Sequence, residues 1–188
     1  MFTNKIILAS QSPRRKQLLE WAEIKFNVMV SDTDEKFPPG LSFDETAVFI
    51  ARNKALAVAA KTDQQIPVLA ADTIVVCDDM ILGKPADRDD AIRILELLSG
   101  KEHRVITGVV ILFNGREISF ADTTFVNFHT LTKDQVFYYV DHYKPYDKAG
   151  AYAIQEWIGV TGIKSVNGDF YNVMGLPVSR VIRELNLL

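Results

Sequence analysis

The chain alternates between short apolar runs, typical of buried strands, and segments whose apolar residues recur three and four positions apart, as on one face of a helix. The strand-like runs are residues 5–9, 26–30, 67–77, 80–82, 104–113, 117–130 and 163–166. The helical spacing covers residues 13–22, 42–61, 87–100, 132–142 and the segment from 177 onward. Between position 143 and the last strand the sequence is rich in Gly, Asp and Lys and predicts a loop.

Capping and turn residues support these boundaries. Ser12 followed by Pro13 is typical of a helix start, and Ser42 with Glu45 predicts a capping box. Asn114–Gly115 between two β-rich runs predicts a tight hairpin turn. Strands alternate with helices early and hairpins dominate the middle, so we predict an α/β fold with a mixed sheet flanked by helices. No repeat or linker divides the chain, and we expect a single domain over residues 1–188.

The composition narrows the class of protein. Its hydrophobic fraction of 48% and charged fraction of 24% are those of a globular protein with a real core. The net charge is -3, and Lys and Arg are scattered among Asp and Glu, so no nucleic-acid surface is expected. The single cysteine, Cys77, cannot form an internal disulfide, which suits a reducing compartment. The apolar run at the N-terminus is too short for a signal peptide or a membrane span, so we expect a cytoplasmic protein with no membrane partner.

Two arginines stand at the start of the first predicted helix. Arg14 and Arg15 lie where the helix dipole and unpaired backbone N–H groups already create a positive potential. An anion bound there would relieve the conflict, since the hydroxyls of Ser10 and Ser12 and both guanidinium groups can converge on phosphate oxygens. The alternative interpretation is a pair of solvated arginines.

A lone carboxylate interrupts the most apolar segment. Asp72 lies inside residues 68–76, where an unpaired ionised carboxylate would cost several kcal/mol. It must gain a cation, take up a proton or lie at the edge of a cleft, and we favour a functional role. Alternation along a strand would put Asp72 and Thr73 on opposite faces, so both serve one site only if the strand ends or bulges there.

Further charged residues become candidate site residues when they are considered together with Asp72 and the arginines. The acidic turn at residues 31–35 offers the oxygen ligands that Mg²⁺ prefers, and Glu35 with Asp72 could hold the ion, although such a turn can also be simply solvated. Lys54 and Lys84 are single lysines that would complement the arginines. The three histidines lack metal-ligand spacing, and the glycine-rich loops of dinucleotide-binding and P-loop proteins are absent.

These motifs together resemble the Maf family of nucleotide pyrophosphatases over nearly the whole chain. The matching segments, in order, are LASQSPRR at 8–15, SDTDE at 31–35, ARNKA at 51–55, AADT at 70–73, GKP at 83–85, SGKEHRVITGV at 99–109, DKAGAYAIQ at 147–155 and NVMGLP at 172–177. The resemblance implies a fold like that of the inosine triphosphate pyrophosphatases, with an elongated, twisted mixed sheet and a cleft between two lobes. It also implies a homodimer that uses a divalent metal, Mg²⁺ or Mn²⁺, to hydrolyse a nucleoside triphosphate to the monophosphate and pyrophosphate.

The resemblance assigns roles to individual residues. Asp72 resembles the family's proton acceptor, and Glu35 a helper at the metal, so these two are the expected metal ligands. The residues that match positions around the phosphates are Ser10, Arg15, Lys54 and Lys84, of which we count Lys84 as catalytic. The residues that match the marks of the dTTP- and UTP-hydrolysing branch, as opposed to the 7-methyl-GTP branch, are Arg14, Thr73 and Gln155.

Two departures from the family pattern concern the choice of base. Ala153 and Gln11 stand where glycine is commoner, and an added Cβ restricts φ, which could tighten the loop or narrow the base pocket. Two alternatives to the dTTP/UTP hypothesis follow. One is the same reaction on another base such as 7-methyl-GTP, and the other is a nucleotide-binding regulator of septum formation, the process behind the family name.

Overall fold

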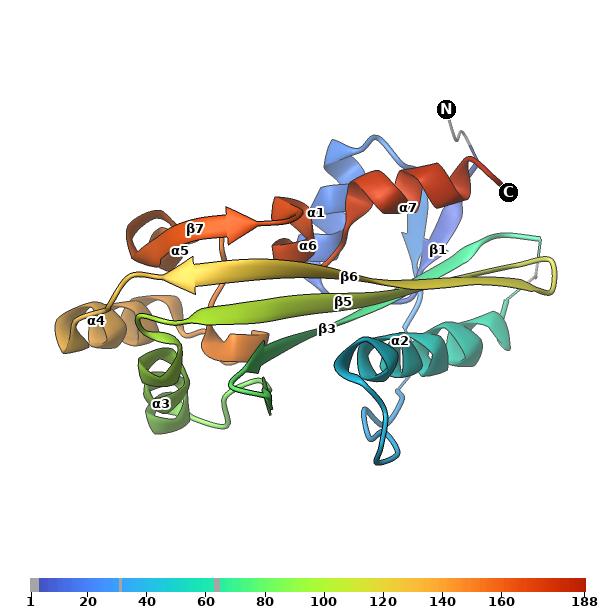
Figure 1. The fold of residues 1–188 in the computed structure, drawn as a ribbon. Helices are drawn as coiled ribbons and strands as arrows, with labels where there is room; N and C mark the ends of the chain where they lie inside the picture. The colour runs from blue at the N-terminus through green and yellow to red at the C-terminus, as the bar shows by residue number, and fades with distance from the viewer. Residues whose placement is uncertain (1–3, 31, 63–64) are drawn as a thin grey trace. The chain divides into compact units, whose positions relative to one another are not determined.

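The computed structural model describes residues 4–30, 32–62 and 65–188 and contains a mixed α/β fold (Figure 1). The strands are β1 (Ile6–Leu8), β2 (Phe26–Val28), β3 (Val68–Cys77), β4 (Met80–Leu82), β5 (Glu102–Phe113), β6 (Arg116–Phe128) and β7 (Ile163–Asn167). The helices are α1 (Pro13–Trp21), α2 (Phe43–Ala59), α3 (Arg88–Leu98), α4 (Lys133–Tyr143), α5 (Trp157–Gly162), α6 (Phe170–Met174) and α7 (Val178–Leu185), with a 3₁₀ turn η1 (Ala149–Ala151). The predicted mixed sheet flanked by helices is confirmed.

The described strands form one sheet in the order β2-β1-β3-β5-β6-β7, with β4 paired to β3. β1 runs parallel to both β2 and β3, with Ile7 opposite Asn27 and Val68. β4 and β7 are antiparallel to their neighbours β3 and β6. The sheet therefore combines parallel pairs near the N-terminus with antiparallel hairpins later, as the alternation of elements predicts.

The capping and turn signals act as predicted. Ser42 Oγ accepts from the backbone N–H of Glu45 at 3.3 Å, and the Glu45 carboxylate accepts from the N–H of Ser42 at 2.8 Å, which completes the capping box of α2. Asn114 and Gly115 have φ values of 48° and 73°, as a two-residue turn between β5 and β6 requires. These local interactions fix where the helices and hairpins begin and end.

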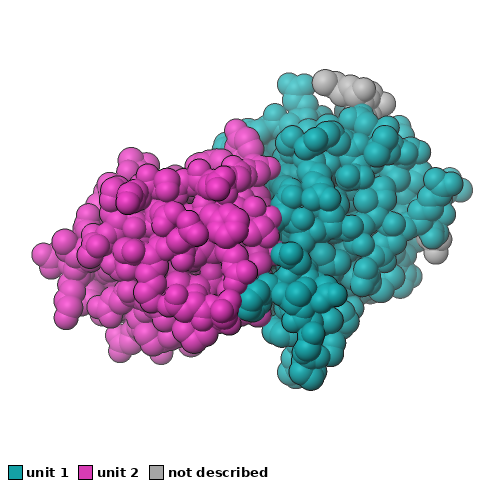
Figure 2. Space-filling view, in the orientation of Figure 1, with its two compact units in different colours: residues 1–73, 107–122, 175–188 teal, residues 74–106, 123–174 magenta. Residues whose placement is uncertain are grey.

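The chain divides into two compact units built from interleaved segments (Figure 2). Unit 1 contains residues 1–73, 107–122 and 175–188, and unit 2 contains residues 74–106 and 123–174. The division cuts β3, β5 and β6, so each long strand contributes to both units. The expectation of a single domain over residues 1–188, and that of a cleft between two lobes, stay predictions.

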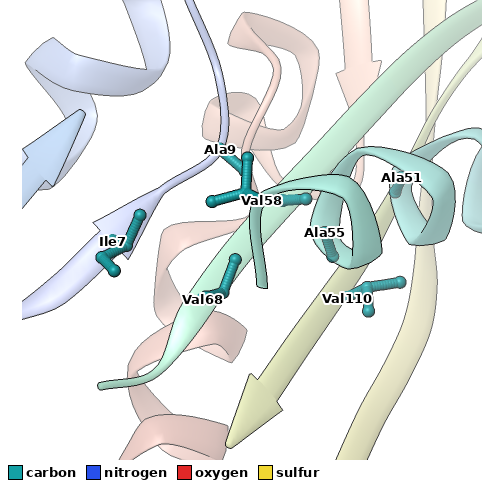
Figure 3. Packing of buried hydrophobic residues seen from close by; sticks show 8 residues of the cluster. Ile7, Ala9, Ala51, Ala55, Val58, Val68 and Val110 are labelled. Atoms are coloured by element: carbon teal, nitrogen blue, oxygen red, sulfur yellow. The ribbon is translucent and has the colours of Figure 1, made fainter. Parts of the chain in front are cut away.

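The core of unit 1 lies where α2 packs on the sheet (Figure 3). Its small and β-branched side chains are Ile7, Ala9, Ala51, Ala55, Val58, Val68, Ala70 and Val110. The approach is closest at Gly108 in β5, where a Cβ atom would lie 2.2 Å from the carbonyl carbon of Ala47 in α2. The missing side chain at Gly108 therefore sets how closely α2 contacts the sheet, and with it the position of every side chain that α2 carries.

The core of unit 2 includes the contact between α3 and α4. The buried residues of these helices are Ala91, Ile94, Leu95 and Leu98 in α3 and Val136, Tyr139 and Val140 in α4. At the surface, the Arg88 guanidinium donates two hydrogen bonds, of 2.6 and 2.9 Å, to the Asp141 carboxylate. The helical spacing of residues 87–100 predicted the apolar face of α3.

The predicted loop from 143 to 162 is only partly correct. It contains η1 and the short helix α5, and α6 follows β7; none of the three was predicted. Each spans at most six residues, too few for a helical period to stand out. Tertiary packing stabilises α5, in which Ile158 and Gly162 are buried.

Candidate active site

The start of α1 holds a buried guanidinium. Arg15 is 9% exposed, and its Nε donates to the Gly175 carbonyl oxygen at 2.7 Å. Its Nη1 donates to Ser10 Oγ at 3.1 Å and its Nη2 to Thr73 Oγ1 at 3.0 Å. Three parts of unit 1, the β1–α1 connection, β3 and the segment before α7, thus converge on one side chain, using three of its five N–H groups.

The charge at this point is strongly positive. The first turn of α1 contains Arg14 and Arg15 and no acidic residue. Burial lowers the pKa of Arg15, the negative charge of Asp72 opposes that shift, the neighbouring Arg14 reinforces it, and Glu35 opposes it again. Arginine stays protonated in proteins, so this end of α1 attracts anions. The opposing effect of Asp72 also means that this carboxylate lies close enough to Arg15 for their charges to interact.

Asp72 has gained the cation that its place in an apolar strand demands. Its side chain is 13% exposed, and Oδ1 accepts a hydrogen bond from Lys54 Nζ of α2 at 2.6 Å. The same Nζ donates to Glu35 Oε1 at 2.8 Å. Lys54 therefore bridges two carboxylates from segments far apart in the chain, and we call Glu35, Lys54 and Asp72 the carboxylate–lysine cluster.

The acidic turn contributes one side chain to this cluster. Asp34 instead pairs with the exposed Lys36 at 3.0 Å, and the hydrogen bonds from Lys36 lower the pKa of Asp34. Ser31, the first residue of the motif, lies outside the described residues. The turn is thus solvated for most of its length, as the alternative interpretation held, while Glu35 faces Lys54.

Thr73 and Asp72 face opposite sides of the sheet, as strand alternation requires. Thr73 Oγ1 accepts from Arg15 of α1 and shares a 3.0 Å hydrogen bond with Thr107 Oγ1, whereas Asp72 bonds Lys54 of α2. In unit 1, α1 and α7 lie on one face of the sheet and α2 on the other (Figure 1). β3 continues to Cys77, so the strand does not end between the two residues. Ser10, Arg15 and Thr73 form one group, and the carboxylate–lysine cluster forms another.

Two predicted site residues belong to unit 2. Lys84 follows β4 and Gln155 follows η1, and both side chains are exposed. Neither makes a hydrogen bond or ion pair with any residue in the described part of the chain. Their segments do meet, because the N–H of Gly150 donates to the carbonyl oxygen of Gly83 at 3.1 Å. Unit 2 therefore presents a cation and an amide from neighbouring loops.

A network beneath the loop at residues 148–156 was not predicted from the sequence. The Tyr139 hydroxyl donates to the Glu156 carboxylate and accepts from the N–H of Ala153 at 3.2 Å. Lys148, which is 8% exposed, lies 2.8 Å from an Asp147 oxygen and 3.5 Å from a Glu156 oxygen. The motif at 147–155 drew attention to this loop, but Tyr139 lies in a separate helix and carried no signal of its own.

A buried pair of aromatic rings, His103 and Tyr152, also fixes the loop at residues 148–156. His103 Nε2 and the Tyr152 hydroxyl lie 2.7 Å apart, and both rings pack edge-on against Phe128. Burial lowers the pKa of His103 to about 4 and raises the pKa of Tyr152. The imidazole is therefore neutral at pH 7 and the phenol protonated, so the pair is joined by a hydrogen bond between neutral groups.

The departure from the family pattern at Ala153 does not strain the backbone. The residues with positive φ in this loop are Gly150 at 70° and Ala151 at 57°. Ala153 and Gln11 are outside the left-handed region, so neither needs the conformational freedom of glycine. The expected restriction of φ is therefore wrong for both positions.

The oxygen ligands of the carboxylate–lysine cluster suit a hard cation. Mg²⁺ is typically held by one or two carboxylates together with substrate phosphates and water. Within residues 4–30, 32–62 and 65–188, no group of three or more His, Cys, Asp or Glu side chains could hold a metal ion. Glu35 and Asp72 thus fit an ion that arrives with a phosphate ligand, and they do not fit a closed protein cage.

A separate hollow of about 500 Å³ in unit 1 contains none of the candidate residues. It is lined by Leu41, Asp44, Glu45, Val48, Phe49, Arg52, Ser119 and Ala121. Its charged groups are already partnered, since Glu45 caps α2 and Arg52 pairs with Glu117 at 2.6 Å. The convergence of charge, and not this hollow, locates the candidate site.

Comparison with known proteins supplies the family. Residues 5–188 match the Maf-like protein family. The chain belongs to the Maf-like family. A relative from Bacteroides fragilis named dTTP/UTP pyrophosphatase is 46% identical over 185 residues, which cover 98% of this chain and 96% of that protein. Another, from Cytophaga hutchinsonii and of the same name, is 48% identical over 180 residues, covering 96% of this chain and 82% of that protein.

Among solved structures, the Staphylococcus aureus Ham1 protein matches with a TM-score of 0.45 and 14% identity, covering 66% of this chain and 72% of that one. None of the helices in the described residues is both long enough and apolar enough to cross a membrane.

Proposed function

We propose that this protein is a nucleoside triphosphate pyrophosphatase that hydrolyses dTTP and UTP to the monophosphate and pyrophosphate. The observation that carries the proposal is the carboxylate–lysine cluster, which lies within electrostatic reach of the buried Arg15. The Maf-like relatives named dTTP/UTP pyrophosphatase cover nearly the full chain and support the same reaction.

The positive groups suit a triphosphate. Phosphoryl transfer depends on positioning and on stabilising the charge that the phosphate oxygens carry in the transition state. Arg14, Arg15 and the N-terminus of α1 attract those oxygens in unit 1. Lys84 is the cation of unit 2 to which the family resemblance gives a role at the phosphates. Each charge pair at 4 Å contributes about 4 kcal/mol at an effective dielectric of 20, so a few contacts are of the size catalysis requires.

Glu35 and Asp72 are the residues we assign to a divalent metal, Mg²⁺ or Mn²⁺. When bound, such an ion neutralises phosphate oxygens and lowers the pKa of bound water. Lys54 Nζ now contacts both carboxylates at 2.8 and 2.6 Å, so it neutralises their mutual repulsion in the free protein. We expect it to turn toward the phosphates when the substrate arrives.

Asp72 is the proton acceptor in this proposal. Water attacks the α phosphorus, the bond from that phosphorus to the bridging oxygen breaks, and pyrophosphate leaves while the water proton passes to the Asp72 carboxylate. Its Oδ1 accepts a 2.6 Å hydrogen bond from Lys54 Nζ, which holds the carboxylate in place. Gln155 carries one amide donor and one acceptor and suits the edge of a pyrimidine ring. Thr73 acts near Arg15, on the other face of the strand from Asp72.

The test is a panel of triphosphates that includes dTTP, UTP, dCTP, GTP and 7-methyl-GTP, each with Mg²⁺ and with Mn²⁺. Products are scored as pyrophosphate or orthophosphate. We expect pyrophosphate and a preference for dTTP and UTP. Release of orthophosphate would refute cleavage between the α and β phosphates, and a preference for 7-methyl-GTP would overturn the choice of base. Chelation of the metal with EDTA is expected to abolish turnover.

We further propose a cytoplasmic homodimer, as the family resemblance implies. Cys77 is buried in β3, and burial raises the pKa of its thiol, which suits a structural role in a reducing compartment. Light scattering coupled to size-exclusion chromatography measures the mass directly. A single species near 21.1 kDa would refute the dimer.

A further inference from the structure

Thr107 is a buried polar residue to which the proposed function assigns no role. Its side chain in β5 is fully buried, and its hydroxyl lies 3.0 Å from that of Thr73 in β3. Thr73 in turn accepts from Arg15 Nη2, and Arg15 Nη1 donates to Ser10. A chain of hydrogen bonds therefore runs from the centre of β5 to the start of α1, and all of it lies within unit 1.

The direction of these bonds constrains the Thr73 hydroxyl. Arg15 can only donate, so Thr73 Oγ1 accepts from it and has a single proton to give. The acceptors within reach are Thr107 Oγ1 at 3.0 Å and the Gly175 carbonyl oxygen at 3.5 Å. Thr107 offers the shorter contact, in which either hydroxyl can be the donor, and the Gly175 carbonyl also accepts from Arg15 Nε at 2.7 Å. Thr107 thus fixes the rotamer of Thr73, and Thr73 fixes one side of the guanidinium.

We infer that Thr107 is a positioning residue for substrate binding, acting through Thr73 on Arg15. This inference rests on the proposed function, in which Arg15 attracts the phosphate oxygens and Thr73 acts beside it. A buried guanidinium that contacts phosphate in both the bound and transition states contributes mainly to affinity. Loss of the Thr107 hydroxyl therefore raises KM more than it lowers kcat.

The first experiment replaces the hydroxyl by a methyl group of similar size. Thr107→Val is expected to raise KM for dTTP about tenfold with kcat changed less than about threefold, since one hydrogen bond contributes on the order of a factor of ten. Thr107→Ser keeps the hydroxyl and is expected to retain a KM close to that of the unmodified protein. An unchanged KM in Thr107→Val, or an equal rise in both variants, overturns the inference. Thr107→Cys, with only a weak S–H donor, gives the same comparison should Thr107→Val not fold.

A double-mutant cycle tests whether Thr107 acts through Thr73. In a Thr73→Val background, Thr107→Val is expected to raise KM less than about twofold further, because the Thr73 hydroxyl that Thr107 positions is already missing. Independent, multiplying effects on KM would place Thr107 outside this chain of contacts and refute the inference.

Thr124 provides a matched control in unit 2. It is also fully buried, accepts from Asn172 Nδ2 at 3.0 Å and donates to the Asp169 carbonyl oxygen at 3.0 Å. Thr124→Val is expected to lower the melting temperature without changing KM. A rise in KM equal to that of Thr107→Val would mean that any lost buried hydroxyl has this effect, and would count against the inference.

The proposed function and this inference fail in different ways. If the unmodified protein releases no pyrophosphate from any triphosphate, the proposed function fails. Calorimetric titration with dTTP then still compares affinity between the unmodified protein and Thr107→Val. A weaker affinity in the variant supports the positioning role independently of turnover, and an equal affinity overturns it.

Discussion

The candidate residues of unit 1 bond to one another, whereas those of unit 2 are exposed on two neighbouring loops, and buried side chains fix the loop that carries Gln155. In unit 1, Lys54 contacts both Glu35 and Asp72, and Arg15 contacts Ser10 and Thr73. In unit 2, the exposed Lys84 and Gln155 bond to none of the described residues, and buried side chains such as Tyr139 and His103 fix the loop below.

This difference separates two requirements of one reaction. Charged groups that stabilise a transition state act best when they are fixed in advance, because no reorganisation is then needed during the reaction. Side chains that select a base must reach a ligand that enters from solvent, so they are exposed while their backbone is held rigid. We therefore propose that the bonded residues of unit 1 act in catalysis and that the exposed Gln155 of unit 2 acts in the choice of base.

The largest expected effect comes from Asp72. Asp72→Asn keeps the shape of the side chain but removes the base, and we expect turnover of dTTP to fall about 10³-fold. Asp78→Asn is the matched control, because Asp78 pairs with Lys101 at the same 2.6 Å distance but lies at the surface of unit 2. It is expected to leave turnover unchanged. Pyrophosphate release measures both variants.

Asp72→Asn, compared with the unmodified protein, also tests whether the protein is an enzyme or a regulatory binding protein. Loss of turnover with retained affinity for dTTP in Asp72→Asn supports the enzyme, and calorimetric titration measures that affinity. If the unmodified protein binds dTTP without turnover, the regulator of septum formation becomes the better hypothesis.

Gly108 tests how strongly unit 1 depends on the close contact of α2. In Gly108→Ala the new methyl group meets the backbone of Ala47, which cannot move aside, so we expect the free energy of unfolding to fall by about 3 kcal/mol. Because α2 carries Lys54, turnover should fall as well. Urea denaturation measures the stability.

Gly83→Ala in unit 2 is the control for this variant. No atom lies within 4 Å of a Cβ built at Gly83, so its free energy of unfolding should change by less than about 1 kcal/mol. Equal losses in both variants would contradict a special role for the contact between Gly108 and α2.

The buried pair of His103 and Tyr152, which fixes the loop of unit 2, predicts that the free energy of unfolding depends on pH. The pKa of His103 is about 4 in the folded protein and about 6.5 when unfolded, so the unfolded chain binds the extra proton between these values. The contribution of the neutral His103 to the free energy of unfolding is therefore complete above pH 6.5. The free energy of unfolding falls by about 3 kcal/mol as the pH drops from there to 4. Urea denaturation across this range measures the loss.

His103→Phe keeps an aromatic ring in the cluster and removes the titrating group. It should flatten the decline between pH 6.5 and 4, even though the lost hydrogen bond to Tyr152 lowers stability at every pH. The exposed His129, replaced by Gln, should leave the decline intact. A decline of the same steepness in His103→Phe would exclude His103 as its source.

The smallest effect is expected from Gln155. Gln155→Ala should reduce the preference for dTTP and UTP over other triphosphates about tenfold while changing kcat little, because one or two hydrogen bonds to the base are lost. Gln17→Ala, on the exposed surface of α1, should leave the preference unchanged. Ratios of kcat/KM across the panel measure the change, and an unaltered ratio in Gln155→Ala would move the choice of base elsewhere.

Much of the fold was predictable because its signals are local. The capping box at Ser42 and the turn at Asn114 involve residues at most three positions apart, and both form as expected. The helices α5 and α6 were missed because six residues or fewer carry no visible period. Both helices bury residues in unit 2, such as Ile158 and Met174, and this packing stabilises them.

The candidate site was predictable in part. Asp72 stood out because a lone acid in an apolar strand needs a partner, but its neighbourhood in sequence does not name Lys54. Nor does the acidic turn indicate that Glu35 reaches Lys54 while Asp34 bonds Lys36. The acceptor for Arg15 at Gly175 is a backbone carbonyl, which every residue possesses, so no residue type could reveal it.

The order of the amino acids was enough to predict the types of the main elements, the places of the charged residues along the chain and the resemblance that suggests a substrate. Which of these residues meet, as Arg15 and Gly175 do across 160 positions, emerged from the folded chain. Periodicity and capping act over a few residues, whereas the pairing of distant groups depends on how closely a helix such as α2 can approach the sheet.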